Sequence, residues 1–327
     1  MRTRFAAVVL GTLVLAGCAS RSSPNSLDPA GSQARSISGL WWVLLWTATG
    51  VFVVVLTLIL WGAFGRRRGN PGGLGDHRFI TVGGIAVPFV ILAIVGVLTV
   101  TVARDISARP EDPFRVEVIG HRWWWEVRYH DTGFVSANEL RVPTGRPVSV
   151  TVRSVDVIHS LWIPQVAGKL DAIPGQPNHL TFELDRPGRI TGLCAEYCGI
   201  QHTNMAIAVV GMEPDDFSKW MAEHSARTSP VSPTSAAEAR GEATFMQEAC
   251  SGCHSIAGTM ATGTVGPALT DLAARPLLGA GAIPNTPENL RRWIADTQGV
   301  KPGSLMPTLD LPPDEVDDLV AYLTGLR

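Results

Sequence analysis

Residues 194–205 have the sequence CAEYCGIQHTNM, which brings two thiols, an imidazole and a thioether close together in the chain. These side chains belong to Cys194, Cys198, His202 and Met205, and a second imidazole, His159, occurs earlier. Soft and borderline ligands of these types favour copper, zinc or an iron–sulfur cluster over magnesium or calcium. The stretch therefore predicts a transition-metal site that also uses a histidine from a distant segment.

A second cysteine motif, Cys250-Ser251-Gly252-Cys253-His254, has the C-x-x-C-H spacing of a covalently attached haem. Cys250 and Cys253 can bond to the two vinyl groups of one haem, and His254 can ligate its iron. Met306, in the later run Gly-Ser-Leu-Met-Pro, is the candidate for the opposite face of the iron. Histidine and methionine together raise the reduction potential, which favours electron transfer over oxygen binding. The weaker rivals for that position are Met246 and Met260.

The segment that precedes the first cysteine motif is rich in residues that favour β-strands. Short runs of them are broken by Pro-Gly turns, which is typical of an all-β sandwich or barrel. The expected strands are 115–119, 123–129, 148–152 and 179–184. A short helix is expected over 215–224, and further helices over 237–249, 287–296 and 313–326.

Two long runs without a charged residue, 39–64 and 79–103, precede the β-rich part. At roughly 1.5 Å per residue each can cross a hydrocarbon core of about 30 Å. Arg66, Arg67 and Arg68 lie between the runs, and positive loops stay in the cytoplasm. We therefore expect two spans, with both large domains on the periplasmic face of a bacterial plasma membrane.

The N-terminus has two arginines, a short apolar run and then Leu15-Ala16-Gly17-Cys18. This pattern predicts a secretory signal, and the cysteine resembles the lipidated residue of a bacterial lipoprotein. With Cys18 lipidated, none of the five cysteines remains for a structural disulfide.

The formal net charge of the chain is −2, which produces no strong positive field. We therefore exclude nucleic acid as a partner.

Together the segments resemble subunit II of haem–copper, cytochrome c-type oxidases, with a cytochrome c domain fused at the C-terminus as in the caa-type variant. The matching segments are the helical hairpin, 120–125, 156–162, 169–175 and 194–205. The resemblance implies a multidomain membrane protein with a two-helix transmembrane hairpin, an all-β cupredoxin-like sandwich and an all-α cytochrome c domain. The expected boundaries are a signal peptide 1–17, a tether 18–38, the hairpin 39–104, the copper domain 105–224, a linker 225–235 and the cytochrome c domain 236–327.

The resemblance also implies roles for individual residues in a dinuclear copper centre, CuA. Cys194 and Cys198 would bridge two coppers, and His159 and His202 would each cap one. Met205 and the backbone carbonyl of Glu196 would be weak ligands. The Glu196 side chain would share a magnesium with the catalytic subunit, and Trp123 would be the residue where electrons enter.

The implied function is an electron-accepting subunit of a terminal cytochrome c oxidase. Its partners would be the haem–copper subunit I, subunit III, membrane lipid, and cytochrome c or another soluble donor. Oxygen would be reduced to water in subunit I, with proton translocation. Three alternatives stay open from the residues: a Cys194–Cys198 disulfide, a two-Cys two-His zinc site, and a membrane-tethered electron carrier without a catalytic partner. A nitrous-oxide-reducing enzyme with a similar copper site would need a large His-rich domain, which this sequence lacks.

Overall fold

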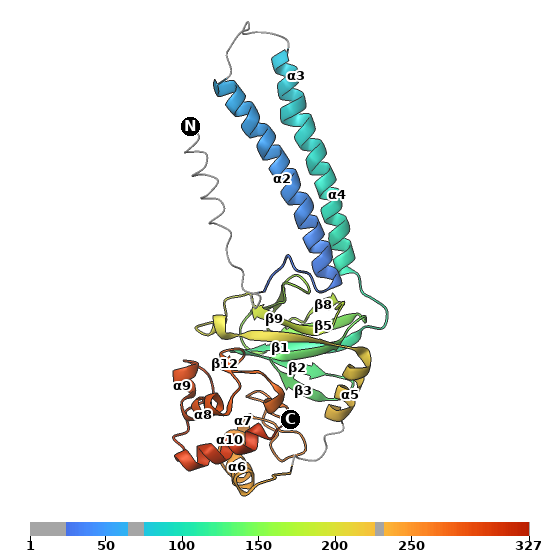
Figure 1. Ribbon diagram of the computed structural model, residues 1–327. Helices are drawn as coiled ribbons and strands as arrows, with labels where there is room; N and C mark the ends of the chain where they lie inside the picture. Colours follow the sequence, from blue (N-terminus) through green and yellow to red (C-terminus); the bar gives the residue numbers. More distant parts are fainter. Residues whose placement is uncertain (1–23, 65–74, 226–231, 327) are drawn as a thin grey trace, which may run out of the picture.

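The computed structural model describes residues 24–64, 75–225 and 232–326, which form three tiers (Figure 1). A helical hairpin stands on a β-sandwich, and a helical domain lies on the side of the sandwich away from the hairpin. This arrangement confirms the predicted fold class. The predicted signal peptide, Cys18 and the three arginines between the helices lie outside the described residues.

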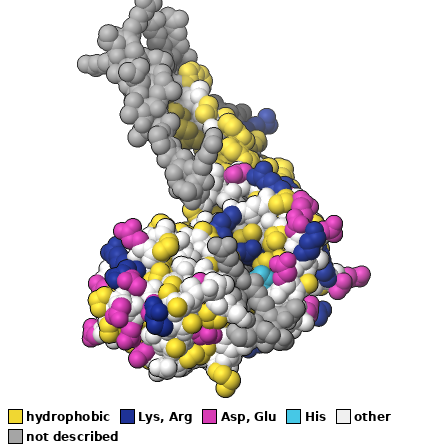
Figure 2. Space-filling model, turned by 60° about the horizontal axis from the view of Figure 1, so that its bottom comes forward, with side chains coloured by type: hydrophobic (Ala, Val, Ile, Leu, Met, Phe, Trp, Pro, Cys, Tyr) yellow, Lys and Arg dark blue, Asp and Glu magenta, His cyan; other side chains and the backbone are white. Residues whose placement is uncertain are grey.

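The hairpin consists of α2 (Ser32–Phe64) and a second helix made of α3 (Gly75–Thr81), the π-helical turn η1 (Val82–Ala86) and α4 (Val87–Ser107). Both are long and apolar enough to cross a membrane, and their apolar windows are not buried within the molecule. Figure 2 shows their hydrophobic surface behind the lower domains, where acidic and basic side chains are mixed. This exposed apolar surface is what a membrane-spanning pair requires.

The first helix begins earlier than the predicted residue 39, inside the stretch predicted as a tether. Ala30 and Ala34 are buried against the sandwich, and the amide of Ala34 donates to the carbonyl of Val166. Arg35 forms an ion pair with Asp185. These contacts stabilise the first turns of α2 on the β domain, so this part of the chain is packed structure.

The β domain is a sandwich of two five-stranded sheets, in the orders β3-β2-β1-β5-β8 and β4-β10-β9-β6-β7. On β5 the buried side chains Val148, Val150 and Val152 alternate with more exposed ones, so one face of the strand packs into the core. The strands are β1 (Phe114–His121), β2 (Trp124–Tyr129), β3 (Phe134–Ala137), β4 (Glu139–Pro143), β5 (Val148–Ser154), β6 (His159–Trp162), β7 (Leu170–Ala172), β8 (Asn178–Phe182), β9 (Gly188–Cys194) and β10 (Ala206–Met212).

The C-terminal domain is helical, as predicted, and has its own apolar core. Its longest helices, α6 and α10, cross at Gly241, where a side chain would collide with the backbone of Asp318. A two-stranded hairpin, β11–β12, projects toward the sandwich. The helices from the end of the sandwich onward are α5 (Pro214–Ser225), α6 (Ala236–Gln247), α7 (Cys250–Cys253), η3 (Leu272–Ala274), α8 (Pro287–Ala295), α9 (Thr297–Val300) and α10 (Pro313–Thr324), and the hairpin strands are β11 (Leu277–Leu278) and β12 (Ile283–Pro284).

Candidate metal centre and haem pocket

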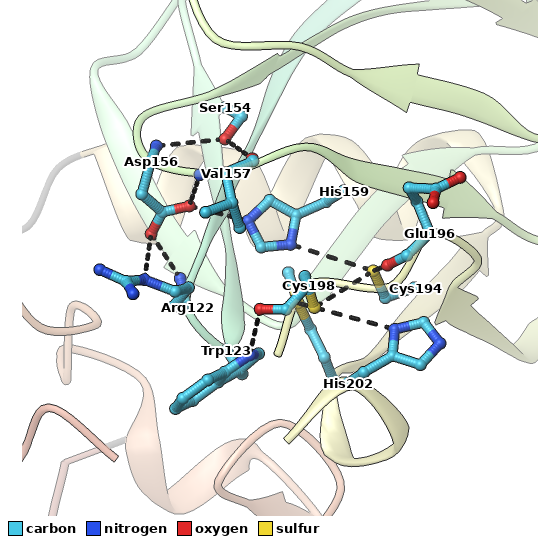
Figure 3. A network of polar contacts seen from close by, with 11 residues as sticks. Arg122, Trp123, Ser154, Asp156, Val157, His159, Cys194, Glu196, Cys198 and His202 are labelled. Atoms are coloured by element: carbon cyan, nitrogen blue, oxygen red, sulfur yellow. Dashed lines mark hydrogen bonds and ion pairs between the residues drawn. The ribbon is translucent and has the colours of Figure 1, made fainter. Parts of the chain in front are cut away.

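The sandwich brings all the predicted metal-binding side chains of the upstream cluster to one end of its second sheet. His159 is the first residue of β6, Cys194 is the last of β9, and the loop between β9 and β10 carries the rest. The two Sγ atoms lie 3.8 Å apart, so the cysteines are free thiols and the disulfide alternative is wrong in this structure. Figure 3 shows the side chains converging on the thiols.

Each thiol has its own imidazole. Sγ of Cys194 lies 3.9 Å from Nδ1 of His159, and Sγ of Cys198 lies 3.8 Å from Nδ1 of His202. Each thiol also has one further potential metal ligand nearby. The carbonyl oxygen of Glu196 lies 3.2 Å from Sγ of Cys194, and Sδ of Met205 lies 3.8 Å from Sγ of Cys198. Because these potential ligand atoms divide into two similar sets around a shared thiol pair, they fit two metal ions. The Glu196 side chain itself is exposed.

Hydrogen bonds set the protonation of this cluster. The hydrogen bond between the two thiols lowers the pKa of Cys194, while the pKa of Cys198 is raised because the pair shares one proton. Burial acts to lower the pKa of His159, but hydrogen bonds to Asp156 and Cys194 raise it overall. A thiolate next to imidazoles is the form that binds soft metals.

The ring of His159 is oriented by Asp156, whose Oδ1 lies 2.9 Å from Nε2. Burial acts to raise the pKa of Asp156, but hydrogen bonds from His159 and from the amides of Val157 and Arg122 lower it overall. The carboxylate therefore accepts the Nε2 proton, and Nδ1 is the nitrogen that faces Cys194 and can bind a metal when the ring is neutral. This is the arrangement that prepares a histidine to bind a metal.

Trp123 lies directly beside the cluster and is buried, at 9 % exposure. Its indole Nε1 donates a 2.8 Å hydrogen bond to the carbonyl of Cys198 (Figure 3). The ring faces the helical domain, because a side chain at Gly303 would come within 3.7 Å of it. The residue predicted as the site of electron input thus lies between the loop that joins β9 to β10 (residues 195–205, the metal loop) and the C-terminal domain.

The C-x-x-C-H motif lines an apolar cavity in the helical domain. Cys250, Cys253, His254 and Met306 all face this cavity. His254 donates from Nδ1 to the carbonyl of Pro267 at 2.7 Å, so Nε2 carries no proton, and burial lowers the pKa of the ring. A neutral imidazole with a free Nε2 and a methionine that line the same apolar cavity fit a haem.

The two rival methionines are less suitable. Met260 is 90 % exposed, and Met246 packs at the edge of the helical core without lining the cavity.

The cavity has a second feature that the sequence did not indicate. Its lining includes Arg122, Trp123 and Trp124 from the sandwich as well as Lys301 from the helical domain. Lys301 lies in a Gly- and Pro-containing loop that resembles any exposed turn in sequence, so no signal singled it out.

Known proteins resemble this chain along nearly its whole length. A cytochrome c oxidase subunit 2 of Alkalihalophilus pseudofirmus is 31 % identical over 338 aligned positions, which cover 99 % of this chain and 97 % of the relative. The chain belongs to the cytochrome c oxidase subunit II family. A cytochrome c oxidase subunit 2 of a Bacillus species is 30 % identical and covers 96 % of this chain and 94 % of its own length.

Family profiles match both soluble domains separately. The profile for the periplasmic domain of cytochrome c oxidase subunit II matches residues 134–212, and the profile for cytochrome c matches 238–327. The crystal structure of the periplasmic domain of subunit II from Bradyrhizobium japonicum is 30 % identical over 35 % of this chain and 95 % of that one, with a TM-score of 0.34. Membership makes the chain part of a haem–copper oxidase, an oxidoreductase, and the two domains imply copper and haem c as cofactors.

Proposed function

We propose that this chain receives electrons at its helical domain and hands them through the metal loop to the haem–copper catalytic subunit. When bound, haem c and the dinuclear copper centre supply one-electron transfer, while oxygen is reduced and protons are translocated with the partner subunit. The observation that carries the proposal is the position of Trp123 between the two sites. Its indole Nε1 donates a hydrogen bond to the Cys198 carbonyl, and the residue also lines the cavity that His254 lines.

In this proposal Cys194 and Cys198 would hold both coppers, His159 and His202 would each hold one, and Met205 and the Glu196 carbonyl would complete the set of ligands. Support comes from the pairing of each thiol with its own imidazole and additional donor. In the helical domain Cys250 and Cys253 would attach the haem, and His254 and Met306 would ligate its iron. Support comes from their common cavity and the hydrogen bond that frees Nε2 of His254.

The membrane topology of the chain and its partner subunits are also part of the proposal. The two helices cross a bacterial plasma membrane, with both soluble domains on the periplasmic side and lipid attached to Cys18 after removal of residues 1–17. The exposed carboxylate of Glu196 contributes to a magnesium site shared with subunit I, and subunit III completes the complex. A soluble cytochrome c or similar donor delivers electrons to the helical domain.

The test replaces both Cys194 and Cys198 with serine in the purified complex. The near-infrared absorption of a mixed-valence copper pair should disappear, while the visible bands of the covalent haem remain. Metal analysis of the unmodified complex should find two copper ions at this site. Zinc, or a single copper in fully loaded protein, would refute the dinuclear centre.

A further inference from the structure

Lys301 lies at the boundary between the two soluble domains and is almost fully buried, at 3 % exposure. Its Nζ donates to three backbone carbonyls: Trp123 at 2.8 Å, Asn204 at 2.7 Å and Gly279 at 2.7 Å. An ammonium group has three protons to donate. All three are therefore used, and each acceptor is a main-chain atom that cannot rotate away.

The three acceptors belong to three different functional segments. Trp123 is the proposed site of electron input, and Asn204 lies in the metal loop between His202 and Met205. Gly279 begins the turn of the β11–β12 hairpin in the helical domain. Lys301 itself ends α9 and opens the loop that carries Met306. One side chain thus connects the loops of both redox sites to the residue between them.

Further hydrogen bonds follow the same boundary. The amide of Ala206 donates to the carbonyl of Ala280 at 2.8 Å, next to the Gly279 acceptor. The side-chain Nε2 of Gln201 donates to the carbonyl of Pro302 at 2.8 Å, next to Lys301. Because both bonds also join the loop between β9 and β10, or the residue that follows it, to loops of the helical domain, the contact defines one relative placement of the domains.

Burying an amine is costly unless its protons find acceptors, so Lys301 adds specificity that an apolar residue would lack. Burial lowers the pKa of Lys301 to about 7. An apolar contact tolerates sliding, whereas three fixed acceptors around one donor group do not. A lysine in this place therefore points to a requirement for orientation.

We propose that Lys301 is a positioning residue that locks the helical domain onto the metal loop, so that the haem pocket faces Trp123 permanently and does not dock anew for each electron. The proposal rests on the proposed function, since it concerns the same electron path. It also implies that the face around Trp123 is closed to a soluble donor, which must instead meet the helical domain.

The test compares Lys301→Met with the unmodified oxidase complex at pH 6, where the lysine keeps its proton. Methionine preserves the aliphatic stem but leaves three buried carbonyls without a donor. Lys219→Met is the matched control, because Lys219 is exposed on α5 and forms an ion pair with Asp216. Near-infrared and haem absorption and the haem potential report whether both cofactors are bound normally.

Two measurements carry the result. Hydrogen exchange at the amide of Ala206 reports opening of the boundary, and we expect it to rise roughly tenfold or more in Lys301→Met, because a stranded carbonyl costs about that factor. Electron transfer from haem to copper after photoreduction should slow and become dependent on solvent viscosity, since it then waits for the domains to re-dock. Lys219→Met should match the unmodified complex in both.

Unchanged exchange at Ala206, together with an unmodified and viscosity-independent transfer rate in Lys301→Met, would overturn the positioning role. If that variant does not assemble with both cofactors, Lys301→Gln is measured in the same way. It keeps an amide donor but reaches fewer of the carbonyls, so the same direction of change is expected and its absence is equally decisive. Failure of the proposed function would differ, because the unmodified complex would then lack the copper band or the internal transfer.

Discussion

Nε2 of His159 lies 2.9 Å from Oδ1 of Asp156, and the opposite nitrogen of the same ring faces the thiol of Cys194. The carboxylate also accepts the amide of Arg122 at 2.7 Å, which connects it to the residue before Trp123. Asp156 therefore does more than occupy a surface loop. It holds a proposed copper ligand in the required tautomer and joins that ligand to the proposed electron path.

Asp156→Asn should weaken copper binding by about tenfold or more, the usual effect of losing a partner that orients a metal-binding histidine. The amide is neutral and can present its NH₂ to the ring, so Nδ1 is no longer kept free. A competition titration of the purified protein with a copper chelator measures the change. Asp131→Asn, at an exposed turn, is the control. Equal affinities in the two variants would show that Asp156 has no part in the site.

Met306→Ala should lower the midpoint potential of the haem, because the thioether ligand favours the reduced iron. Spectroelectrochemical titration of the visible haem bands measures it. The control is Met260→Ala, since Met260 is 90 % exposed and does not line the cavity. A potential that falls in the control and not in Met306→Ala would assign the ligand elsewhere.

Gly241→Ala should destabilise the helical domain by about 3 kcal/mol, the upper part of the range for overpacking. The new methyl would collide with the carbonyl oxygen of Asp318 and lie 2.9 Å from Cβ of Tyr322, so α6 and α10 must separate. Thermal unfolding followed by circular dichroism of the haem band measures the loss. Ala239→Ser, on an exposed position of the same helix, should change little. An unshifted melting temperature for Gly241→Ala would contradict the close helix crossing.

Glu126 should make the sandwich sensitive to acid. Burial acts to raise the pKa of Glu126, but hydrogen bonds from His121 and Arg128 lower it below its ordinary value of 4.5. A carboxyl with a lowered folded-state pKa stabilises the fold above the unfolded-state pKa and loses that contribution as the pH falls through the folded-state value.

Glu126→Gln should therefore cost about 2 kcal/mol near pH 7, the loss of a hydrogen-bonded charge, and progressively less below pH 4.5. Chemical unfolding of the protein at a series of pH values measures the difference. Glu213→Gln is the control, because Glu213 is exposed. A cost that stays constant down to the acid limit would contradict the titration of Glu126.

The strands expected from the sequence all belong to one sheet. Runs 115–119, 123–129, 148–152 and 179–184 correspond to β1, β2, β5 and β8, which are neighbours in the order β3-β2-β1-β5-β8. The sandwich was expected, but the strands of its second sheet, which carries the metal ligands, were not located. Its strands β6 and β7 are short, and β9 and β10 contain glycines, which weaken strand patterns in a single sequence.

In the helical hairpin the sequence predicted the helices but not the residue at which the first one begins. Hydropathy located both helices, because a long uncharged run is a strong signal. It could not locate the start of α2, since Ser32, Ala34 and Ser38 are polar or small and become helical through contacts with the sandwich. Burial of Ala34 and the ion pair of Arg35 with Asp185 depend on residues more than a hundred positions away.

The sequence alone determined the chemistry of this protein, because the identities and spacing of Cys194, Cys198 and His202, and of Cys250 and His254, are local properties of the chain. Ligand types and short spacings limit which cofactor can bind before any folding is known. Only the tertiary structure decided how the two sites are related. Lys301 and Trp123 meet across 178 positions of sequence, and a contact between such distant segments depends on the packing of two complete domains.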